Sequence, residues 1–142
     1  MIMETLNVQI ESKSENESLA RVIVSAFAAR LDPTLEEISD IKTAVSEAVT
    51  NCVIHGYEEK DGIIFIECTI EENNLTISIK DEGVGIEDIE KARLPMYSTK
   101  RDKERSGMGF SFMEIFMDKL TVESELNKGT VVTMIKKIGN IS

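Results

Sequence analysis

The sequence predicts an α+β fold, a two-layer sandwich in which helices pack on one face of a mixed, mainly antiparallel sheet. Helical periodicity dominates the first part of the chain, strand-like alternation comes in pairs separated by short turns, and single strands do not alternate with single helices. Strands joined by hairpins pair antiparallel, whereas a parallel sheet needs alternating strand–helix units. No repeat or linker-like run interrupts the 142 residues, so we expect a single domain over residues 1–142.

A strand and a helix are predicted at the start of the chain. Residues 6–11 alternate strictly between apolar and polar types, as a half-buried strand does. Ser14 and Glu17 then have the spacing of a capping box, and Pro33 disfavours helix in the residue before it, so we expect a helix between them. The predicted buried side of this helix consists of Leu19, Val22, Ile23, Ala26 and Phe27.

A second, longer helix follows. Thr34 and Glu37 form another capping box, and Gly56 is placed to end the helix. Its predicted buried side consists of Ile38, Ile41, Val45, Ala48 and Cys52. Because both helices carry an apolar side, we expect them to pack together.

The rest of the chain predicts two hairpins. Alternating runs at 63–70 and 75–80 flank a four-residue turn, and runs at 120–126 and 130–137 flank a three-residue turn that contains glycine. Between the hairpins we expect a short helix over 87–93, then a charged loop over 94–106. After this loop the pattern predicts a helix over 110–120.

The chain is acidic. Asp and Glu outnumber Lys and Arg by 26 to 16, which gives a formal net charge of −10. This charge argues against a broad nucleic-acid surface, because phosphate groups would be repelled, and it fits a basic partner better. The sequence has no signal-peptide pattern at its start and no segment apolar enough to span a membrane, so we expect a cytoplasmic protein.

The two cysteines give no sign of a disulfide or a metal site. Cys52 and Cys68 are far apart and have no CxxC spacing, so we expect two buried, reduced thiols. His55 is the only histidine, which nearly excludes a site built from histidine and cysteine.

A polar stripe runs along the second predicted helix. Glu47, Asn51 and His55 follow one another at intervals of four residues and project from one side. Such a stripe either faces solvent or lines a site, and the helix alone does not decide between the two. We assign His55 to the structure of the helix end.

Asp81, Gly83 and Gly85 come directly after an alternating strand. The two glycines let the backbone turn sharply and let another group approach closely, and a carboxylate at a strand end is well placed to accept a hydrogen bond. A tight turn after an edge strand would explain the same residues. A calcium loop is disfavoured, because no run of alternating oxygen ligands follows.

Gly107 and Gly109 precede a predicted helix, whose free N–H groups and dipole favour an anion. The loop before them concentrates basic residues in an otherwise acidic chain, namely Lys100, Arg101, Lys103 and Arg105. A triphosphate would explain this charge, and so would a solvated loop, because Asp102 and Glu104 are interspersed. The pattern is neither a P-loop nor a dinucleotide-binding fingerprint.

These three elements together resemble the motifs of the GHKL ATPases and kinases. The segment from Glu47 to Asn51 resembles the N box, residues 81–85 resemble the G1 box, and residues 107–109 resemble the G2 box. From about Leu6 to Lys137 the chain is similar to the sporulation anti-sigma-F factors, a family of serine kinases. The resemblance implies the GHKL fold, also called the Bergerat fold.

The resemblance also implies a site for ATP and Mg²⁺. Asn51 would coordinate the metal, and Asp81, supported by Thr130, would accept a hydrogen bond from the adenine amino group. Glu47 would be the catalytic base that takes the proton from the substrate serine, and Arg105 would contact the γ-phosphate and stabilise its charge. The other residues expected to contact the nucleotide are Gly83, Gly85, Thr99, Lys100, Gly107 and Gly109.

The partners implied by the resemblance are two proteins. In such kinases the first helix faces both, so Glu17 and Arg21 are expected to contact a sigma factor of the sigma-F type and the anti-anti-sigma protein that is phosphorylated on a serine. Ordinary surface charges on an amphipathic helix are the alternative reading of these two residues. A homodimer is implied as well, and direct binding to nucleic acid or membrane is not expected.

Three other functions share these motifs. A serine kinase that controls a stress-response sigma factor would look much the same. A nucleotide-gated inhibitor without kinase activity would need Asn51 but no base, so Glu47 argues against it. The catalytic domain of a histidine kinase would depend on a phosphoacceptor histidine outside the N box, and here His55 is the only histidine.

Overall fold

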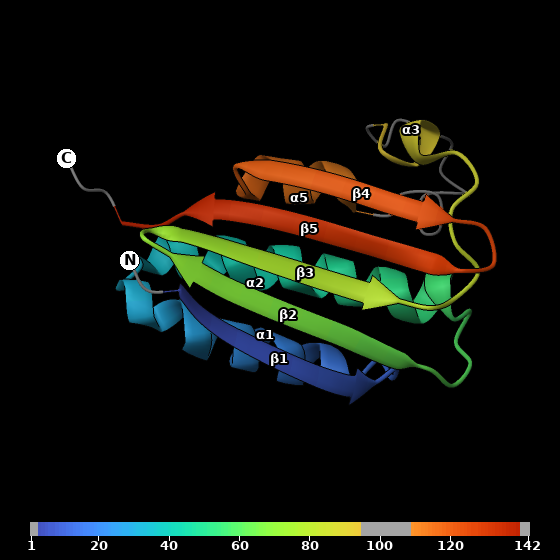
Figure 1. Cartoon of the computed structure of the whole chain (residues 1–142), viewed down its shortest axis with the longest axis horizontal. Helices are drawn as coiled ribbons and strands as arrows, with labels where there is room; N and C mark the ends of the chain where they lie inside the picture. Colours follow the sequence, from blue (N-terminus) through green and yellow to red (C-terminus); the bar gives the residue numbers. More distant parts are fainter. Residues whose placement is uncertain (1–2, 95–108, 140–142) are drawn as a thin grey trace.

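A five-stranded sheet carries helices on one of its faces in the computed structural model, which describes residues 3–94 and 109–139 (Figure 1). The strands are β1 (Met3–Glu11), β2 (Ile63–Glu71), β3 (Asn74–Asp81), β4 (Lys119–Glu125) and β5 (Gly129–Lys137). Their order across the sheet is β1-β2-β3-β5-β4, and every neighbouring pair is antiparallel. The predicted two-layer α+β fold is confirmed. The expectation of a mixed sheet is wrong for the described strands, because none of them pairs parallel.

The helical layer is built mainly from three helices. The helical elements are α1 (Asn16–Ala28), the 3-10 turn η1 (Ala29–Leu31), α2 (Leu35–Thr50), the π-helix η2 (Asn51–Gly56), α3 (Ile89–Ala92) and α5 (Phe110–Phe116). As predicted, α1 packs against α2, and α2 also packs against α5. The helix expected over 110–120 ends earlier, because Lys119 already pairs with Ile135 in the sheet. No helix of the described residues is long and apolar enough to cross a membrane.

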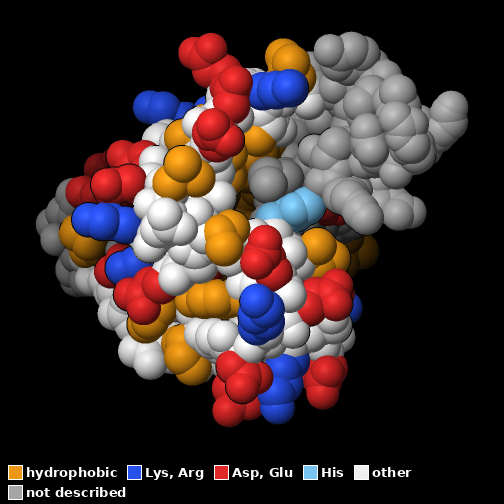
Figure 2. Space-filling view, turned by 90° about the vertical axis from the view of Figure 1, so that its right-hand side faces the viewer, with side chains coloured by type: hydrophobic (Ala, Val, Ile, Leu, Met, Phe, Trp, Pro, Cys, Tyr) orange, Lys and Arg blue, Asp and Glu red, His pale blue; other side chains and the backbone are white. Residues whose placement is uncertain are grey.

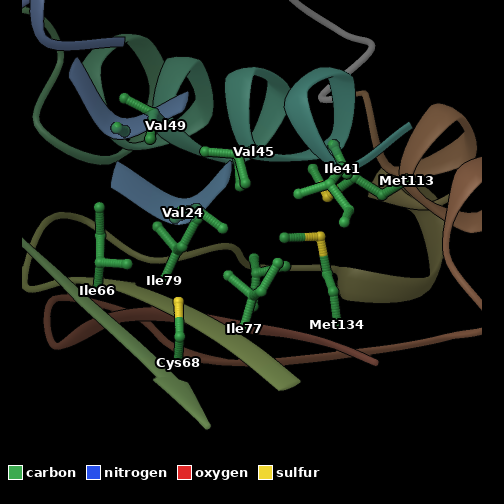
Figure 3. Packing of buried hydrophobic residues seen from close by; sticks show 14 of the residues in the cluster. Val24, Ile41, Val45, Val49, Ile66, Cys68, Ile77, Ile79, Met113 and Met134 are labelled. Atoms are coloured by element: carbon green, nitrogen blue, oxygen red, sulfur yellow. The ribbon is translucent and has the colours of Figure 1, made fainter. Parts of the chain in front are cut away.

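The core lies between these helices and one face of the sheet (Figure 3). Helix residues on one side meet strand residues on the other, and all of them are buried. The helices contribute Val24, Ile41, Val45, Val49 and Met113. The strands contribute Ile66, Cys68, Ile77, Ile79 and Met134. Aliphatic and sulfur-containing side chains fill this layer, in keeping with the low aromatic content of 5%. Both cysteines are free and buried, as expected.

The start of α2 follows its sequence signal. The Glu37 N–H donates to Thr34 Oγ1 at 3.0 Å, and the Thr34 N–H donates to Glu37 Oε1 at 2.9 Å, so both bonds of the predicted capping box are present. The predicted buried side of α2 is also confirmed, since its residues are buried or, for Ile38, partly buried against the core. This helix therefore has a defined orientation over the sheet.

The start of α1 differs from its prediction. The Ser14 side chain caps nothing; instead the Ser14 carbonyl oxygen accepts the Glu17 N–H at 3.1 Å in a backbone turn. The helix begins two residues later at Asn16, whose side chain donates to the Glu11 carbonyl oxygen at 2.8 Å. The predicted capping box at Ser14 and Glu17 is therefore wrong.

The buried side of α1 also differs. It consists of Ala20, Val24, Phe27 and Ala28. Of the five residues predicted to be buried, only Phe27 is, while Leu19 and Val22 are 45% and 62% exposed. Helix α1 is thus rotated relative to the prediction, and it turns apolar side chains toward solvent.

Candidate functional site

A small pocket opens at the end of the sheet where β3 finishes. It lies between β3, β5, η2 and α5, and most of its wall is apolar. The polar side chains that line it are Asn51, His55, Asp81 and Thr130. Figure 2 views the molecule from this end, where the histidine side chain is visible and acidic and basic groups alternate on the surface. An apolar pocket with a few convergent polar groups is the usual form of a small-molecule site.

The pocket wall depends on a change in helix type at Asn51. There α2 passes into the π-helix η2, in which the Tyr57 N–H donates to the Cys52 carbonyl oxygen at 2.8 Å. The wider turn places Asn51 and His55 on the pocket, while Glu47 lies outside its lining. The predicted polar stripe is therefore split between two locations. His55 does stand at the helix end as expected, and it also lines the pocket.

Asp81 is the buried carboxylate of the pocket. It is only 4% exposed, and its Oδ1 accepts the Gly83 N–H at 2.9 Å. Burial raises the pKa of Asp81, while hydrogen bonds from Gly83, Cys52 and Thr130 act in the opposite direction. A Cβ atom on Gly56 would lie 2.7 Å from Asp81 Oδ2, so the missing side chain at position 56 makes room for the carboxylate.

The turn after Asp81 packs closely against the backbone of η2 and against the end of β4. A Cβ atom on Gly83 would come within 2.0 Å of the Gly56 carbonyl oxygen, and this oxygen accepts the Val84 N–H at 2.9 Å. Gly85 has a φ of +80° and approaches the Glu125 carbonyl oxygen. Gly85 lines the pocket, whereas Gly83 does not. Gly83 therefore serves the contact between the turn and η2.

Two residues that the sequence did not single out hold this turn. Tyr57 accepts the Glu82 N–H at 2.7 Å through its hydroxyl, which donates to the Ile63 carbonyl oxygen at 2.6 Å. Ser124 Oγ accepts the Ile86 N–H at 2.7 Å. These partners lie 25 and 38 residues apart along the chain, and no local pattern marks them.

Ser124 also connects the turn to Thr130. Its Oγ donates to the Gly129 carbonyl oxygen at 3.0 Å and lies 2.8 Å from Thr130 Oγ1. Thr130 is 8% exposed and pairs with Asp81 across β3 and β5. The structure thus brings Asp81 and Thr130 side by side, as the resemblance implied, and Ser124 links the turn after β3 to β5.

Glu47 lies next to the start of α5. A Cβ atom on Gly109 would be 2.2 Å from Glu47 Oε1, and the φ of Gly109 is +71°. Burial raises the pKa of Glu47, and the charge of Glu17 raises it further. A carboxylate with a raised pKa beside a pocket is a candidate proton acceptor.

Glu17 and Arg21 occupy α1 near this base. Arg21 Nη1 lies 3.5 Å from Glu17 Oε2 and donates to Ser46 Oγ of α2 at 2.9 Å. Both charged side chains are about one third exposed. They are therefore accessible to another protein, while the hydrogen bond fixes Arg21 against α2.

Some predicted site residues lie outside the described part of the chain, namely Thr99, Lys100, Arg105 and Gly107. Among the described residues, no group of three or more histidine, cysteine or acidic side chains could hold a metal ion. Asn51, on the pocket wall, is the described residue that the resemblance assigns to Mg²⁺. An amide oxygen suits that ion, and the phosphates and water commonly supply its other ligands.

Comparison with known proteins identifies the same fold. A family model described as a histidine kinase-like ATPase domain matches residues 10–136. The catalytic domain of the histidine kinase ThkA, solved in a nucleotide-free form, gives a TM-score of 0.56 at 18% identity, over 95% of this chain and 96% of that domain. At this level of identity the likeness concerns the fold alone.

Relatives with much higher identity are named anti-sigma F factor. The protein from Thermoanaerobacter sp. (strain X514) is 64% identical over 129 residues, which cover 91% of this chain and 90% of the relative. The proteins from Clostridium acetobutylicum and Clostridium kluyveri are 57% and 54% identical over 141 and 142 residues, with coverage of 99% and 100% on both sides. The chain therefore belongs to the anti-sigma F factor family, built on a histidine kinase-like ATPase domain.

Proposed function

We propose that this protein is an ATP-dependent anti-sigma factor and a protein serine kinase. It binds a sporulation sigma factor of the sigma-F type and phosphorylates a serine of the anti-anti-sigma protein that opposes it. The names of the relatives support the anti-sigma role, and the ATPase family supports nucleotide binding. The observation that carries the kinase proposal is the position of Glu47, half-buried against Gly109 at the start of α5 and close to the pocket of Asp81.

The pocket fits an adenine nucleotide by its chemistry. Asp81 is a buried carboxylate with one oxygen held by the Gly83 N–H, and it would accept a hydrogen bond from the adenine amino group. Thr130 would support this contact, and apolar walls would cover the ring. A buried carboxylate beside an apolar wall costs free energy unless it is hydrogen-bonded, so a ligand that donates a further hydrogen bond to Asp81 would stabilise it.

The phosphate end of the site is assigned to other residues. Asn51 would hold Mg²⁺ through its amide oxygen without adding charge. Thr99, Lys100, Gly107 and Arg105 would contact the phosphates, and Arg105 would stabilise the charge of the transferred group. ATP supplies the phosphoryl group, and Mg²⁺ offsets its negative charge.

Glu47 is proposed as the base. It would accept the proton of the substrate serine hydroxyl as that oxygen attacks phosphorus. Burial and Glu17 raise the pKa of Glu47, which makes the ionised carboxylate a better proton acceptor. Glu17 and Arg21 would contact the two protein partners from α1, next to this base.

The direct test compares phosphate transfer by the unchanged protein and by Glu47→Gln, with purified anti-anti-sigma protein as substrate. The variant keeps the shape of the side chain but removes its basicity, so we expect transfer to fall by roughly a hundredfold or more. Glu36→Gln is the matched control, because Glu36 lies on the same helix and is exposed. Equal transfer by all three proteins would refute the base assignment, and no transfer by any of them would favour a nucleotide-gated inhibitor.

A homodimer is part of the proposal. The helices cover one face of the sheet, and the other face is open in the described structure (Figure 1). That face carries half-buried residues such as Phe65, Val131 and Ile135, which a second copy would cover. Sedimentation equilibrium of the purified protein tests it, and a mass that stays near 15.9 kDa at every concentration would refute it.

A further inference from the structure

One arginine joins the exposed sides of α1 and α2. Arg21 Nη1 donates to Ser46 Oγ at 2.9 Å, and Nη2 donates to Ser18 Oγ at 3.2 Å. The guanidinium also lies 3.5 Å from Glu17 Oε2, and the Arg21 side chain is still 34% exposed. A guanidinium has five N–H donors, so this one is held from one side and keeps donors for another molecule.

Of the three groups that contact Arg21, only the Ser46 hydroxyl belongs to α2. Ser46 directly precedes Glu47 in the chain, and it does not line the pocket. Glu17, the ion-pair partner of Arg21, lies near enough to Glu47 to influence its ionisation. The hydrogen bond thus fixes the arginine of α1 against Ser46, the residue that precedes the proposed base Glu47 in the chain.

We propose that Ser46 is a positioning residue for substrate binding: its hydroxyl holds Arg21 against α2, one residue from Glu47, so that Arg21 presents a fixed guanidinium to a carboxylate of the substrate protein. This inference rests on the proposed function, in which the acceptor serine of the antagonist must reach Glu47. A carboxylate bound at Arg21 would then anchor the segment that delivers this serine.

Two physical arguments support an acidic group as the ligand of Arg21. A guanidinium matches a carboxylate with two parallel N–H donors, and this geometry works best when the side chain is already oriented. Most of the surface would repel an acidic group, because the chain has a net charge of −10. An acidic group of the partner should therefore bind at the Arg21 guanidinium. Because this guanidinium is already held in place, less side-chain entropy is lost on binding.

The test measures the affinity for the purified anti-anti-sigma protein from the same organism, in the presence of ADP so that no phosphate is transferred. Ser46→Ala removes the hydroxyl, and we expect affinity to fall roughly fivefold to tenfold, as for a lost hydrogen bond to a charged group. Ser46→Thr keeps the hydroxyl and should bind within about twofold of the unchanged protein. Ser18→Ala removes the longer and more exposed bond and should cost less than Ser46→Ala.

A double-mutant cycle separates positioning from a merely structural role. If Ser46 acts through Arg21, then Ser46→Ala added to Arg21→Ala causes no further loss of affinity. Two results would overturn this inference and leave the proposed function standing. One is that Ser46→Ala lowers the affinity equally in the presence of Arg21 and in the Arg21→Ala variant. The other is that Ser46→Ala binds the antagonist as tightly as the unchanged protein. If the unchanged protein fails to bind the antagonist at all, both are overturned.

Discussion

Gly109 lies so close to Glu47 that a Cβ atom at position 109 would be 2.2 Å from Glu47 Oε1. The same glycine has a φ of +71° and precedes the first residue of α5. A residue expected only to let backbone approach a nucleotide is therefore also a packing partner of the proposed base. The start of α5 and the position of the Glu47 carboxylate depend on each other.

This contact predicts the effect of Gly109→Ala. The added methyl group would displace the Glu47 carboxylate, and the left-handed backbone would be strained by about 1–2 kcal/mol. We expect phosphate transfer to fall by roughly tenfold or more, because the base is moved. Gly139→Ala is the matched control, since Gly139 has a similar φ of +80°. It should lose stability in a thermal melt but keep transfer, and equal loss of transfer in both variants would contradict the account.

The raised pKa of Glu47 predicts a pH effect. Only the ionised carboxylate accepts a proton, so transfer should fall as pH decreases through the pKa of Glu47. Burial raises this pKa first, and the charge of Glu17 raises it further. Glu17→Gln removes the second effect, so the pKa decreases and the acidic limb of the pH–rate profile moves to lower pH. Single-turnover rates at saturating substrate measure this limb.

The control for the pH effect is Glu15→Gln, which removes the same charge from the residue just before α1. Glu15 does not contribute to the shift at Glu47, so its variant should keep the profile of the unchanged protein. A profile that is the same for all three proteins would mean that Glu47 is not the titrating base.

Asp81 predicts nucleobase selectivity. Asp81→Asn keeps an oxygen for the Gly83 N–H but places an amide donor opposite the adenine amino group. Two donors then face each other, and ATP affinity should fall roughly tenfold to a hundredfold. Inosine triphosphate carries a carbonyl oxygen in place of the amino group, so its affinity should fall less or increase. Calorimetry with both nucleotides checks this, and parallel losses would show that Asp81 does not read the base.

Ser124 predicts a coupled loss of stability and affinity. Ser124→Ala would leave the partly buried Ile86 N–H without its acceptor, at about 1 kcal/mol, and would release Thr130 from its neighbour. We expect a lower melting temperature and a several-fold weaker affinity for ATP. Thr121→Ala, on the same strand but exposed, should change neither. A loss of affinity in Thr121→Ala of the same size would contradict a specific role for Ser124.

The helices and strands whose apolar residues recur with a single clear spacing were predictable from the sequence. Helix α2 has apolar residues on one side and a capping box, and both hairpins alternate cleanly, so their bounds differ little from the predictions. Helix α1 has apolar residues around most of its circumference. Periodicity then does not select a side, and packing against α2 and the sheet decides that Val24 is buried and Val22 is not.

The site was predictable only where its residues form motifs. Asn51, Asp81 and Thr130 meet at one pocket, as the resemblance implied. No local sequence pattern predicts the π-helix, because hydrogen bonds to distant parts of the chain stabilise it. One of them runs from the Val84 N–H to the Gly56 carbonyl oxygen. The role of Ser124 was not predicted for the same reason, because its hydrogen-bond partners belong to another turn and another strand.

The account depends most directly on binding of ATP together with Mg²⁺, which isothermal titration calorimetry of the purified protein measures. We predict saturable binding with Mg²⁺ present, clearly weaker binding when the metal is chelated, and loss of this difference in Asn51→Ala, because the variant lacks the amide oxygen proposed to hold the ion. If ATP binds equally well with and without Mg²⁺, or does not bind at all, the proposed site is wrong and the regulatory role built on it falls.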